Sequence, residues 1–358
     1  MRSLGGIWAA SLVVGLTGAD SARAFEPTYP NICYDSVCDR PEAAHMLDVW
    51  MPPGDPAGLP TIICVHGGAW RTGDKRDHDG INYELARDGF GVVCCNYTLS
   101  TPDTGAFPQN ITDIKNVIRW VREVGVAEPY GLSPRVVLLG PSAGAHLSVL
   151  AATSEGESAF EVVPATWAGG YSVQAAVSFF GALDLEFHML PNVDSEKEAV
   201  EQMIGERYPS DLFRQASPLT YLAAGDPPIA MRHGNRDSTV PFEESLRFRD
   251  AMLEFGVFTP TDENGEIIKI GAGHGWGDFG NTAQLRDEIT GYIADIMPPG
   301  DVTGDQVVDL SDVGVVLGHW GECAATHGVA YPITADLDDD GCIGLGDIGI
   351  ILAYIPEP

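Results

Sequence analysis

A serine flanked by two glycines is the feature of this sequence that points most directly to chemistry. Residues 140–144 read Gly-Pro-Ser-Ala-Gly, and they lie between a strand-like run at 136–139 and a helix-compatible run at 145–152. A serine hydroxyl is a weak nucleophile at neutral pH, so it needs an exposed turn, a neighbouring base and a helix N-terminus that favours developing negative charge. The G-x-S-x-G pattern between a strand and a helix provides such a turn and predicts that Ser142 is a nucleophile.

A base for this serine has to come from one of nine histidines. His274 lies in the glycine-rich stretch 271–277, just after a strand-like run, where a ring can reorient. His66 is expected to structure its own turn. His146 follows the serine by one helical turn and is expected to pack or to form a hydrogen bond. We therefore favour His274.

An aspartate is expected to orient the imidazole of the base. Asp237 follows the short apolar run 228–231, so it can lie on a loop at a strand end. Its place between Ser142 and His274 gives the chain order Ser, Asp, His that one hydrolase fold shows. Asp184 also follows a strand-like run and is the alternative, with the capping of a turn as its other role. We favour Asp237.

The turn His-Gly-Gly-Ala-Trp at 66–70 follows a strand-like run at 61–65. A flexible glycine backbone can direct N–H groups into a site. Together with the amide of Ala143, the amides of Gly67 and Gly68 are predicted to form an oxyanion hole. An ordinary tight turn after a strand is the alternative.

Three aromatic residues near these motifs are candidates for a surface that contacts an acyl group or a sugar ring: Trp70, Phe107 and Trp276. Packing in the core or at the rim of the site is the alternative role for each of them.

Short β-rich runs alternate with helical patterns between residues 25 and 298, which is typical of βα units on a mostly parallel sheet. Isoleucines and valines at helical spacing predict a helix over 110–124 with one buried stripe, and a further helix is expected over 243–255. The runs expected to form strands are 61–65, 91–97, 136–139 and 173–180.

Residues 47–293 resemble the α/β-hydrolase fold and, within it, exported esterases of the feruloyl/acetyl-xylan esterase-like and hormone-sensitive-lipase-like groups. The motifs that carry the resemblance are LDVWMPP at 47–53, HGGAWRTGDK at 66–75, NYTL at 96–99, FP at 107–108, GPSAGAHL at 140–147, SPLT at 217–220, the Asp237 segment at 233–241 and GHG at 273–275. The resemblance implies that Ser142 is the nucleophile, His274 the base and Asp237 the acid that orients it. It also implies three oxyanion donors, which are Gly67, Gly68 and Ala143.

Two residues depart from the pattern of these esterases. Pro141 stands where they more often carry Asp, His, Glu or Gln, and it removes one N–H group and changes the wall beside the serine. Ala69 replaces a third glycine that many lipase-like relatives have, so the resemblance implies nothing about esters of bulky tertiary alcohols.

The C-terminal segment differs from the rest of the chain in charge. Residues 299–358 hold 11 Asp or Glu and no Lys or Arg, out of a net charge of −31 for the whole chain. Within this segment, 336–347 places Asp at loop positions 1, 3, 5 and 12 and Gly at position 6, as an EF-hand-type calcium loop requires. A second copy begins 35 residues earlier, with Gln306 at the glycine position. The predicted calcium ligands are Asp301, Thr303, Asp305 and Asp312 in one loop and Asp336, Asp338, Asp340, Cys342 and Asp347 in the other.

Each loop runs into an apolar segment, 313–320 or 348–355, which predicts two short helices packed face to face. Paired loops of this kind resemble a dockerin type I module, a family that anchors secreted enzymes to cohesin domains through two calcium ions. The resemblance covers residues 300–355 and implies calcium binding and a cohesin-type partner. Gln306 and the long spacer 321–335 depart from the compact family pattern.

Composition bounds the function classes. Hydrophobic residues make up 44% of the chain and aromatic residues 9%, which is a globular composition. With a net charge of −31, nucleic acid and anionic membrane surfaces are not expected partners, because their phosphates would meet a repulsive field. A serine, histidine and aspartate need no cofactor for acyl transfer, so none is expected in catalysis.

The N-terminus has the pattern of an export signal. Arg2 supplies a positive charge, 7–18 is an apolar run too short to span a bilayer, and 22–24 is an A-x-A cleavage site. We expect removal of residues 1–24 and a secreted protein, extracellular or periplasmic, with an α/β domain at 25–298 and a calcium-loop domain at 299–358.

Export permits disulfides among the seven cysteines. Cys33 with Cys38, and Cys323 with Cys342, are the candidate pairs. The other three cysteines, at 64, 94 and 95, lie in apolar strand-like runs, where free cysteine behaves as a small hydrophobic residue.

The sequence and its resemblances together favour a secreted serine carboxylic ester hydrolase that removes acetyl or feruloyl groups from plant or algal polysaccharide. The alternatives on the same triad are a carboxylesterase of small molecules, an arylformamidase-like amidase and a peptidase. A catalytically silent binding module is the alternative from another class.

Overall fold

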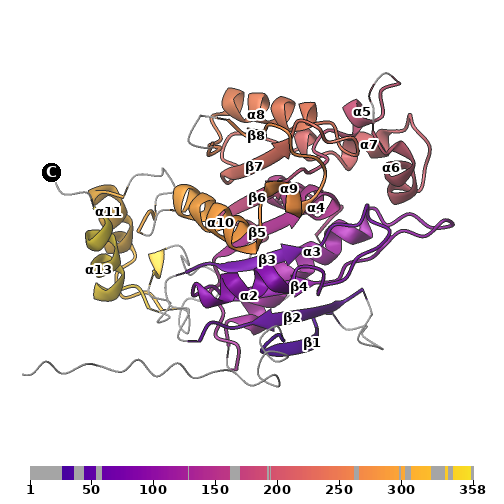
Figure 1. Ribbon diagram of the computed structural model, residues 1–358. Helices are drawn as coiled ribbons and strands as arrows, with labels where there is room; N and C mark the ends of the chain where they lie inside the picture. The colour runs from indigo at the N-terminus through magenta and orange to yellow at the C-terminus, as the bar shows by residue number, and fades with distance from the viewer. Residues whose placement is uncertain are drawn as a thin grey trace, which may run out of the picture.

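A central sheet of eight strands runs through the larger part of the chain, and helices cover both of its faces (Figure 1). This computed structural model describes residues 26–35, 44–53, 59–127, 129–161, 170–191, 193, 195–261, 266–297, 300–302, 308–323, 335–337 and 342–355. The predicted signal peptide lies outside the described residues. The strands are β1 (Tyr29–Cys33), β2 (Met46–Trp50), β3 (Thr61–Val65), β4 (Val92–Cys95), β5 (Val136–Pro141), β6 (Ala175–Phe179), β7 (Ile229–Gly234) and β8 (Ile268–Lys269).

The strands lie in the order β1-β2-β4-β3-β5-β6-β7-β8. Strand β2 is antiparallel to both of its neighbours, β1 and β4, whereas the neighbours from β4 to β8 are parallel. Every residue of β3, β4, β5 and β6 is buried, which explains their nearly continuous apolar sequences, since a parallel sheet is covered on both faces. The prediction of a mostly parallel sheet is therefore confirmed.

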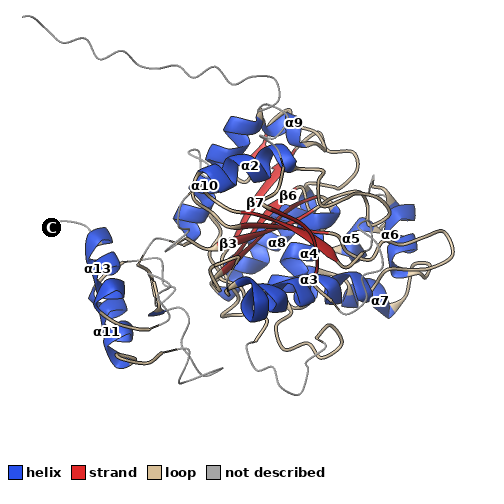
Figure 2. Ribbon diagram, turned by 90° about the horizontal axis from the view of Figure 1, so that it is seen from below, coloured by secondary structure: helices blue, strands red, loops and turns tan. Residues whose placement is uncertain are grey.

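The helices divide between the two faces of the sheet (Figure 2). Helices α2 (Asp79–Arg87) and α10 (Thr282–Ile296) pack against each other on one face, together with the short α9 (Trp276–Phe279). Helices α3 (Gln109–Trp120), α4 (Ala143–Thr153) and α8 (Glu243–Phe255) lie on the other face. Each face has its own core of buried side chains.

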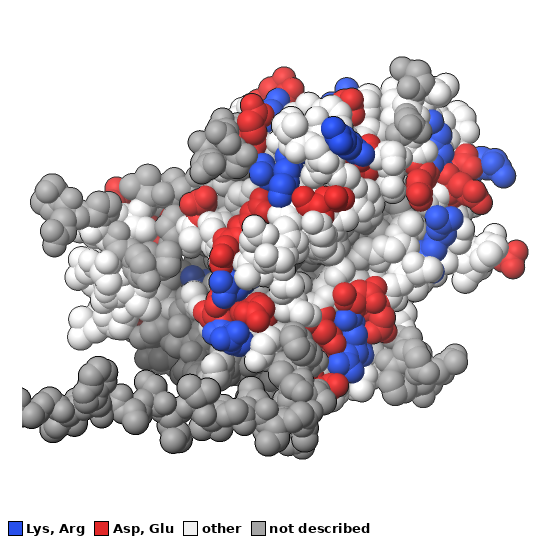
Figure 3. Space-filling view, in the orientation of Figure 1, with Lys and Arg blue, Asp and Glu red and all other residues white. Residues whose placement is uncertain are grey.

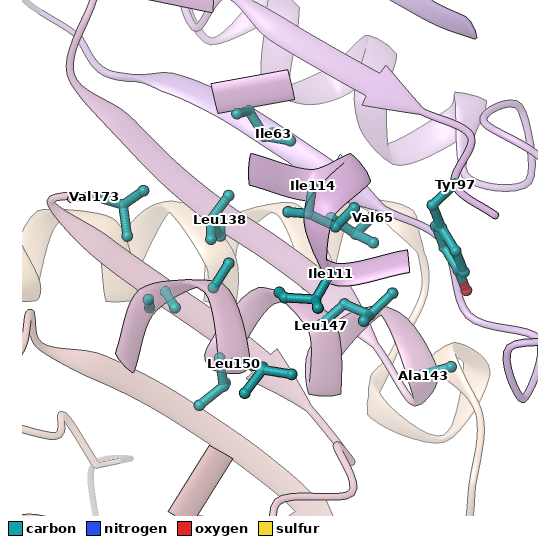
Figure 4. Close-up of a cluster of buried hydrophobic side chains, with 14 of the residues drawn as sticks. Ile63, Val65, Tyr97, Ile111, Ile114, Leu138, Ala143, Leu147, Leu150 and Val173 are labelled. Carbon is teal, nitrogen blue, oxygen red and sulfur yellow. The ribbon is translucent and has the colours of Figure 1, made fainter. Parts of the chain in front are cut away.

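The larger core lies between the sheet and the helices α3 and α4. Figure 4 shows Ile111 and Ile114 of α3 and Leu147 of α4 directed toward Leu138 and Val65 of the sheet. These five side chains are fully buried. The apolar stripe of α3 is the one that the spacing of its isoleucines and valines predicts.

The predicted helix over 110–124 changes its geometry near its end. Helix α3 stops at Trp120 and continues as the π-helix η1 (Val121–Gly125), in which the N–H of Val126 bonds to the carbonyl of Val121 at 2.9 Å. Arg122 in this turn donates to three backbone carbonyls that are distant in sequence, those of residues 134, 170 and 172. Helical periodicity contains no information about such contacts, so the sequence did not predict the wider turn.

Between β6 and β7 the chain adds short elements at one end of the sheet. These are α5 (Leu185–His188), α6 (Lys197–Ile204), α7 (Asp211–Gln215) and the 3₁₀-helix η2 (Pro218–Thr220).

The C-terminal segment has a small core of its own. Helices α11 (Leu310–Gly318) and α13 (Leu345–Tyr354) lie side by side, apart from the central sheet (Figure 1). Their core includes Val316, Ile343 and Ile351, and it is separate from the two cores of the α/β part. The two short helices were expected at 313–320 and 348–355, and each begins about three residues earlier, where Asp312 or Asp347 in the first turn accepts the backbone N–H of the N-cap residue. In α11 the side chain of the N-cap Asp309 also accepts a backbone N–H and completes a capping box, whereas the N-cap of α13 is Gly344, which has no side chain.

The position of this segment relative to the sheet follows from one surface pocket. Asp301 and Val302 line it together with Arg135, Gln174 and Pro228, which stand next to the first residues of β5, β6 and β7. The C-terminal segment therefore meets the α/β domain at the amino ends of the parallel strands.

The surface of the α/β domain carries both signs of charge. Lys and Arg side chains are interspersed with Asp and Glu on the face that Figure 3 shows. Among the described helices, none has both the length and the apolar character needed to cross a membrane.

Candidate active site

Four loops at the carboxyl ends of parallel strands bring the predicted site residues to one edge of the sheet. Ser142 follows β5, Asp237 follows β7, His274 follows β8, and the turn 66–70 follows β3. Because the carboxyl ends of parallel strands meet at the same edge, loops that are far apart in the sequence meet there. The site lies opposite the edge that the C-terminal segment contacts.

The three side chains form a continuous chain of hydrogen bonds. The Nε2 atom of His274 lies 2.8 Å from the Oγ atom of Ser142, and its Nδ1 atom lies 2.6 Å from Oδ2 of Asp237. A carboxylate only accepts hydrogen bonds, so Nδ1 carries the proton and Nε2 is free to accept the serine proton. The arrangement of nucleophile, base and acid that the sequence predicts is thus present in the structure.

Asp237 is held as a carboxylate by its surroundings. Burial of its side chain would raise its pKa, but hydrogen bonds from His233 and His274 outweigh burial and hold the pKa well below its usual range. Its second oxygen, Oδ1, accepts the backbone N–H groups of Thr239 and Val240 at 2.8 and 2.9 Å. The carboxylate therefore stays ionised and fixed, ready to stabilise an imidazolium at His274.

His233 is a residue of the site that the sequence analysis did not assign. Its Nε2 atom lies 3.2 Å from Oδ2 of Asp237 and 3.1 Å from the carbonyl of Val240, while Nδ1 lies 2.8 Å from the hydroxyl of Ser245. Since both partners of Nε2 are acceptors, Nε2 carries the proton. The only sequence signal was its place at the end of β7, four residues before the acid.

The turn at Ser142 is strained, as a nucleophile at a strand-to-helix turn requires. Ser142 has φ 55° and ψ −123°, an uncommon conformation for a non-glycine residue, and it is the N-cap of α4. Its N–H donates to the carbonyl of Phe179 in β6 at 2.8 Å. Gly144 allows α4 to approach β3, because a Cβ atom there would lie 2.1 Å from the carbonyl oxygen of Val65.

The turn after β3 passes beside the nucleophile. A Cβ atom built on Gly67 would lie 3.5 Å from Cβ of Ser142 and 3.2 Å from the carbonyl oxygen of Pro141, so only glycine fits this approach comfortably. Gly68 lies partly exposed next to it, and Ala143 is the first residue of α4. The predicted oxyanion donors thus come from the two segments that flank the serine hydroxyl.

The three aromatic candidates lie in different surroundings. Trp70 is only 4% exposed, and its indole N–H bonds to His146, so the expectation that it contacts substrate is wrong: burial leaves no face for a ligand. Phe107 is partly buried and packs edge-on against Phe160. Trp276 is half-buried, two residues after the base, and contacts Phe179.

The wall beside the base is an aromatic ring that the sequence analysis did not single out. Phe180 packs edge-on against His274, with 4.7 Å between ring centroids, and it has φ 44°. A positive φ is a marked outlier for a bulky residue, and such strain concentrates at functional sites.

The alternative site residues have structural roles. Asp184 caps α5 by accepting the N–H of Phe187, and it pairs with Arg247 at 2.8 Å. The Nδ1 atom of His66 lies 2.7 Å from the carbonyl of Gly67, within its own turn. These contacts agree with the preference for Asp237 as the acid and with the role expected of His66.

The predicted calcium loops are described in part. Thr303, Asp305, Asp338 and Asp340 lie outside the described residues. The last ligand positions are described, and the fully buried Asp312 and Asp347 have equivalent hydrogen bonds. Asp312 accepts the N–H groups of residues 302 and 309, and Asp347 those of 337 and 344, all between 2.5 and 2.8 Å.

In each twelve-residue segment these hydrogen bonds join positions 2 and 9 to the carboxylate at position 12. Within the described part of the chain, no group of three or more His, Cys, Asp or Glu side chains is placed to hold a metal ion.

The cysteines follow the predictions as far as they are described. Cys323 and Cys342 form a disulfide across the spacer between the two C-terminal helices. Cys33 is also disulfide-bonded, while Cys38, its expected partner, lies outside the described residues. The cysteines at 64, 94 and 95 are buried free thiols in the sheet.

Curated proteins with similar sequences include esterases. Esterase LipQ of Mycobacterium tuberculosis is 32% identical over 225 residues, which are 60% of this chain and 51% of LipQ. The probable carboxylic ester hydrolase LipM of the same organism is 35% identical over 221 residues, 59% of this chain and 49% of LipM. The chain thus spans about half the length of the curated relatives that it matches.

Solved structures share the fold. A truncated form of a carbohydrate esterase from gut microbiota has a TM-score of 0.62 and 26% identity, and the match covers 74% of this chain and 95% of that one. The apo form of esterase 2 of Thermogutta terrifontis has a TM-score of 0.58 and 26% identity, with 75% and 93% covered. These matches confirm the α/β-hydrolase fold. The BD-FAE family model matches residues 47–252, more than half of the 358 residues, and the chain therefore belongs to the BD-FAE family.

Proposed function

We propose that this protein is a serine carboxylic ester hydrolase that works through an acyl-enzyme. The observation that carries the proposal is the hydrogen-bonded chain from Ser142 through His274 to Asp237, at 2.8 and 2.6 Å. The esterases among the relatives and among the structural neighbours support it.

In the first half of the reaction, Ser142 Oγ attacks the ester carbonyl carbon while His274 Nε2 takes the hydroxyl proton. The carbonyl oxygen becomes an oxyanion, which the amides of Gly67, Gly68 and Ala143 stabilise. The imidazolium that forms is stabilised by Asp237. Collapse of the tetrahedral intermediate breaks the bond to the alcohol oxygen, and His274 returns the proton to that leaving group.

In the second half, water replaces the alcohol. His274 takes a proton from the water as it attacks the acyl-enzyme carbonyl, and the bond to Ser142 Oγ breaks as the proton returns to the serine. The acid is released and the enzyme is restored. The residues named supply every proton transfer, so the cycle is complete without a cofactor.

The proposed substrate is an acylated polysaccharide, with acetyl or feruloyl groups. The carbohydrate esterase from gut microbiota supports this choice, as do the export signal and the dockerin-like tail in the sequence. The same support leads us to propose that the protein is secreted. Small esters, formamides and peptides are the alternative substrates on this triad.

The experiment compares the wild-type protein with Ser142→Ala on p-nitrophenyl acetate, acetylated xylan, methyl ferulate and an aryl formamide. Loss of the serine hydroxyl should reduce kcat by about 10⁶-fold, because every later step depends on the covalent intermediate. Wild-type turnover that persists in Ser142→Ala would contradict the mechanism. Efficient deacylation of the polymer would support the polysaccharide substrate, whereas turnover of small esters alone would assign a small-molecule esterase.

We also propose that the C-terminal segment binds two calcium ions and docks to a cohesin-type domain. The supporting observation is that the 35-residue spacing of the two loops also relates pairs of exposed leucines on the two helices. Leu310 and Leu345 are 73% and 77% exposed, and Leu317 and Leu352 are 54% and 55% exposed. Equivalent buried aspartates, Asp312 and Asp347, accept the backbone N–H at position 2 of their segments. Exposed apolar residues in matching positions of two packed helices are typical of a protein-binding face.

Calorimetry on the full chain tests the calcium proposal. Wild type should bind two calcium ions, and Asp347→Ala, which removes a ligand from one loop only, should bind one. If titration of calcium into protein pretreated with a chelator gives no heat of binding, the proposal is contradicted. A pull-down with a cohesin domain, using Leu317→Ser/Leu352→Ser as the non-binding variant, tests the partner.

A further inference from the structure

The turn that carries the predicted oxyanion donors has a conformation that needs external support. Three consecutive residues have positive φ angles: Gly68 at 108°, Ala69 at 54° and Trp70 at 57°. The left-handed region is unfavourable for Ala and especially for a bulky residue such as Trp, so neighbouring groups have to hold the turn in place.

The side chain and the carbonyl of Trp70 provide this anchor. Its carbonyl accepts the N–H of Ser100 at 2.8 Å and the hydroxyl of the same serine at 3.1 Å. On the other side, its indole N–H donates to Nδ1 of His146 at 3.1 Å, and the two rings meet edge-on with 5.0 Å between centroids.

His146 belongs to the same helix as the nucleophile. It lies one turn after Ser142 in α4, where its N–H donates to the carbonyl of Ser142 at 3.0 Å. Its ring is fully buried, and its Nε2 atom lies 2.8 Å from the carbonyl of Ala216. A carbonyl only accepts, so Nε2 carries the proton and Nδ1 is the acceptor that the indole N–H requires.

The imidazole of His146 keeps this protonation state at the pH at which the enzyme is active. Burial lowers the pKa of His146 to about 4. The ring is therefore neutral under conditions in which His274 must also be neutral to act as a base, and Nδ1 remains an acceptor.

We propose that His146 is a positioning residue: through Trp70 it fixes the turn 66–70 relative to Ser142, so that the amides of Gly67 and Gly68 face the oxyanion. The inference rests on the proposed esterase function. It assigns a task to a histidine that takes no part in proton transfer, and it explains why a tryptophan beside the site is buried.

Three variants test the inference on p-nitrophenyl acetate. His146→Leu removes the acceptor, and Trp70→Phe removes the donor while keeping an aromatic ring. A displacement of the oxyanion donors by about 1 Å costs about 10²-fold, so both variants should lose about that factor in kcat with little change in KM. His146→Asn places an amide oxygen near the position of Nδ1 and should recover most of the loss.

A matched control separates the lost hydrogen bond from the change in ring volume. Trp50 in β2 is 2% exposed, and its indole N–H has no hydrogen-bond partner among the described residues. Trp50→Phe should therefore keep wild-type kcat. Stoichiometric labelling of Ser142 by a phosphonate counts the folded, competent fraction of every variant, so that kcat is expressed per active site.

The double variant His146→Leu/Trp70→Phe completes a cycle. Because the two residues act as one unit, the kcat of the double variant should be no lower than that of the less active single variant. Three results would overturn the inference. The first is a wild-type kcat per labelled site in His146→Leu or Trp70→Phe, and the second is a kcat of His146→Asn no higher than that of His146→Leu. The third is a loss of kcat in the double variant equal to the product of the two single losses. A wild-type protein without esterase activity would instead overturn the proposed function.

Discussion

Replacing Asp237 by Asn tests the hydrogen-bond chain at its least replaceable point. Oδ1 of Asp237 accepts the two backbone N–H groups of Thr239 and Val240, so the amide oxygen of an asparagine has to take that position. Its NH₂ group then lies where Oδ2 lies now, 2.6 Å from Nδ1 of His274. Two donors would face each other.

The imidazole can avoid this clash only by changing its tautomer. If the proton moves from Nδ1 to Nε2, His274 presents a donor to Ser142 Oγ and can no longer accept the serine proton. We expect kcat/KM to fall by about 10⁴-fold, which is the effect of a wrong tautomer in a serine, histidine, aspartate triad. That factor corresponds to about 5 kcal/mol of transition-state stabilisation.

The assay is hydrolysis of p-nitrophenyl acetate, with thermal unfolding and circular dichroism to measure the folded fraction. Asp184→Asn is the matched control, since Asp184 also follows a strand of the sheet but caps α5. Asparagine is as good an N-cap as aspartate, so this variant should keep kcat/KM within about threefold of wild type. Asp237→Asn with a loss smaller than about tenfold, or an equal loss in both variants, would refute the reasoning.

Three further predictions concern stability and the C-terminal segment. Burial lowers the pKa of His78 and of His146 from 6.5 to about 4, so between these pH values the unfolded chain binds more protons than the folded protein. The free energy of unfolding should therefore fall as pH drops from about 6.5 to about 4. Denaturant titrations at several pH values should show a smaller fall in His146→Asn than in wild type. Gly144→Ala should destabilise the protein by about 3 kcal/mol or more, because its Cβ atom would lie 2.1 Å from the carbonyl oxygen of Val65. A Cβ atom on Gly291 of α10 meets nothing within 4 Å, so Gly291→Ala is the control. Thermal melts should show a lower Tm for Gly144→Ala and a slightly higher Tm for Gly291→Ala than for wild type. Removal of calcium by a chelator should leave ester hydrolysis unchanged, because the C-terminal segment meets the domain at the amino ends of the strands; a parallel loss of kcat would contradict that placement.

The sequence predicted the sheet and the main helices because their signals are local. Apolar runs of four to seven residues predicted β3, β4 and β5, and helical spacing predicted α3. The two antiparallel strands, β1 and β2, were not predicted. Strand β1 lies at the edge of the sheet with a partly exposed, mixed sequence, and the apolar run of β2 is interrupted by Asp48. Edge strands are defined by their pairing with a neighbour, and a single segment contains no record of that partner.

The chemistry of the site was also determined by the sequence: a serine at a strand-to-helix turn, a histidine in a glycine-rich loop and an aspartate between them in chain order. Residue types and their flanking segments fix which groups can react, so the sequence alone predicts Ser142, His274 and Asp237. Only the tertiary structure decided how these groups are held. His233, Phe180 and the burial of Trp70 depend on contacts between segments that are distant in sequence, and such contacts exist only once the sheet has brought the strand ends together.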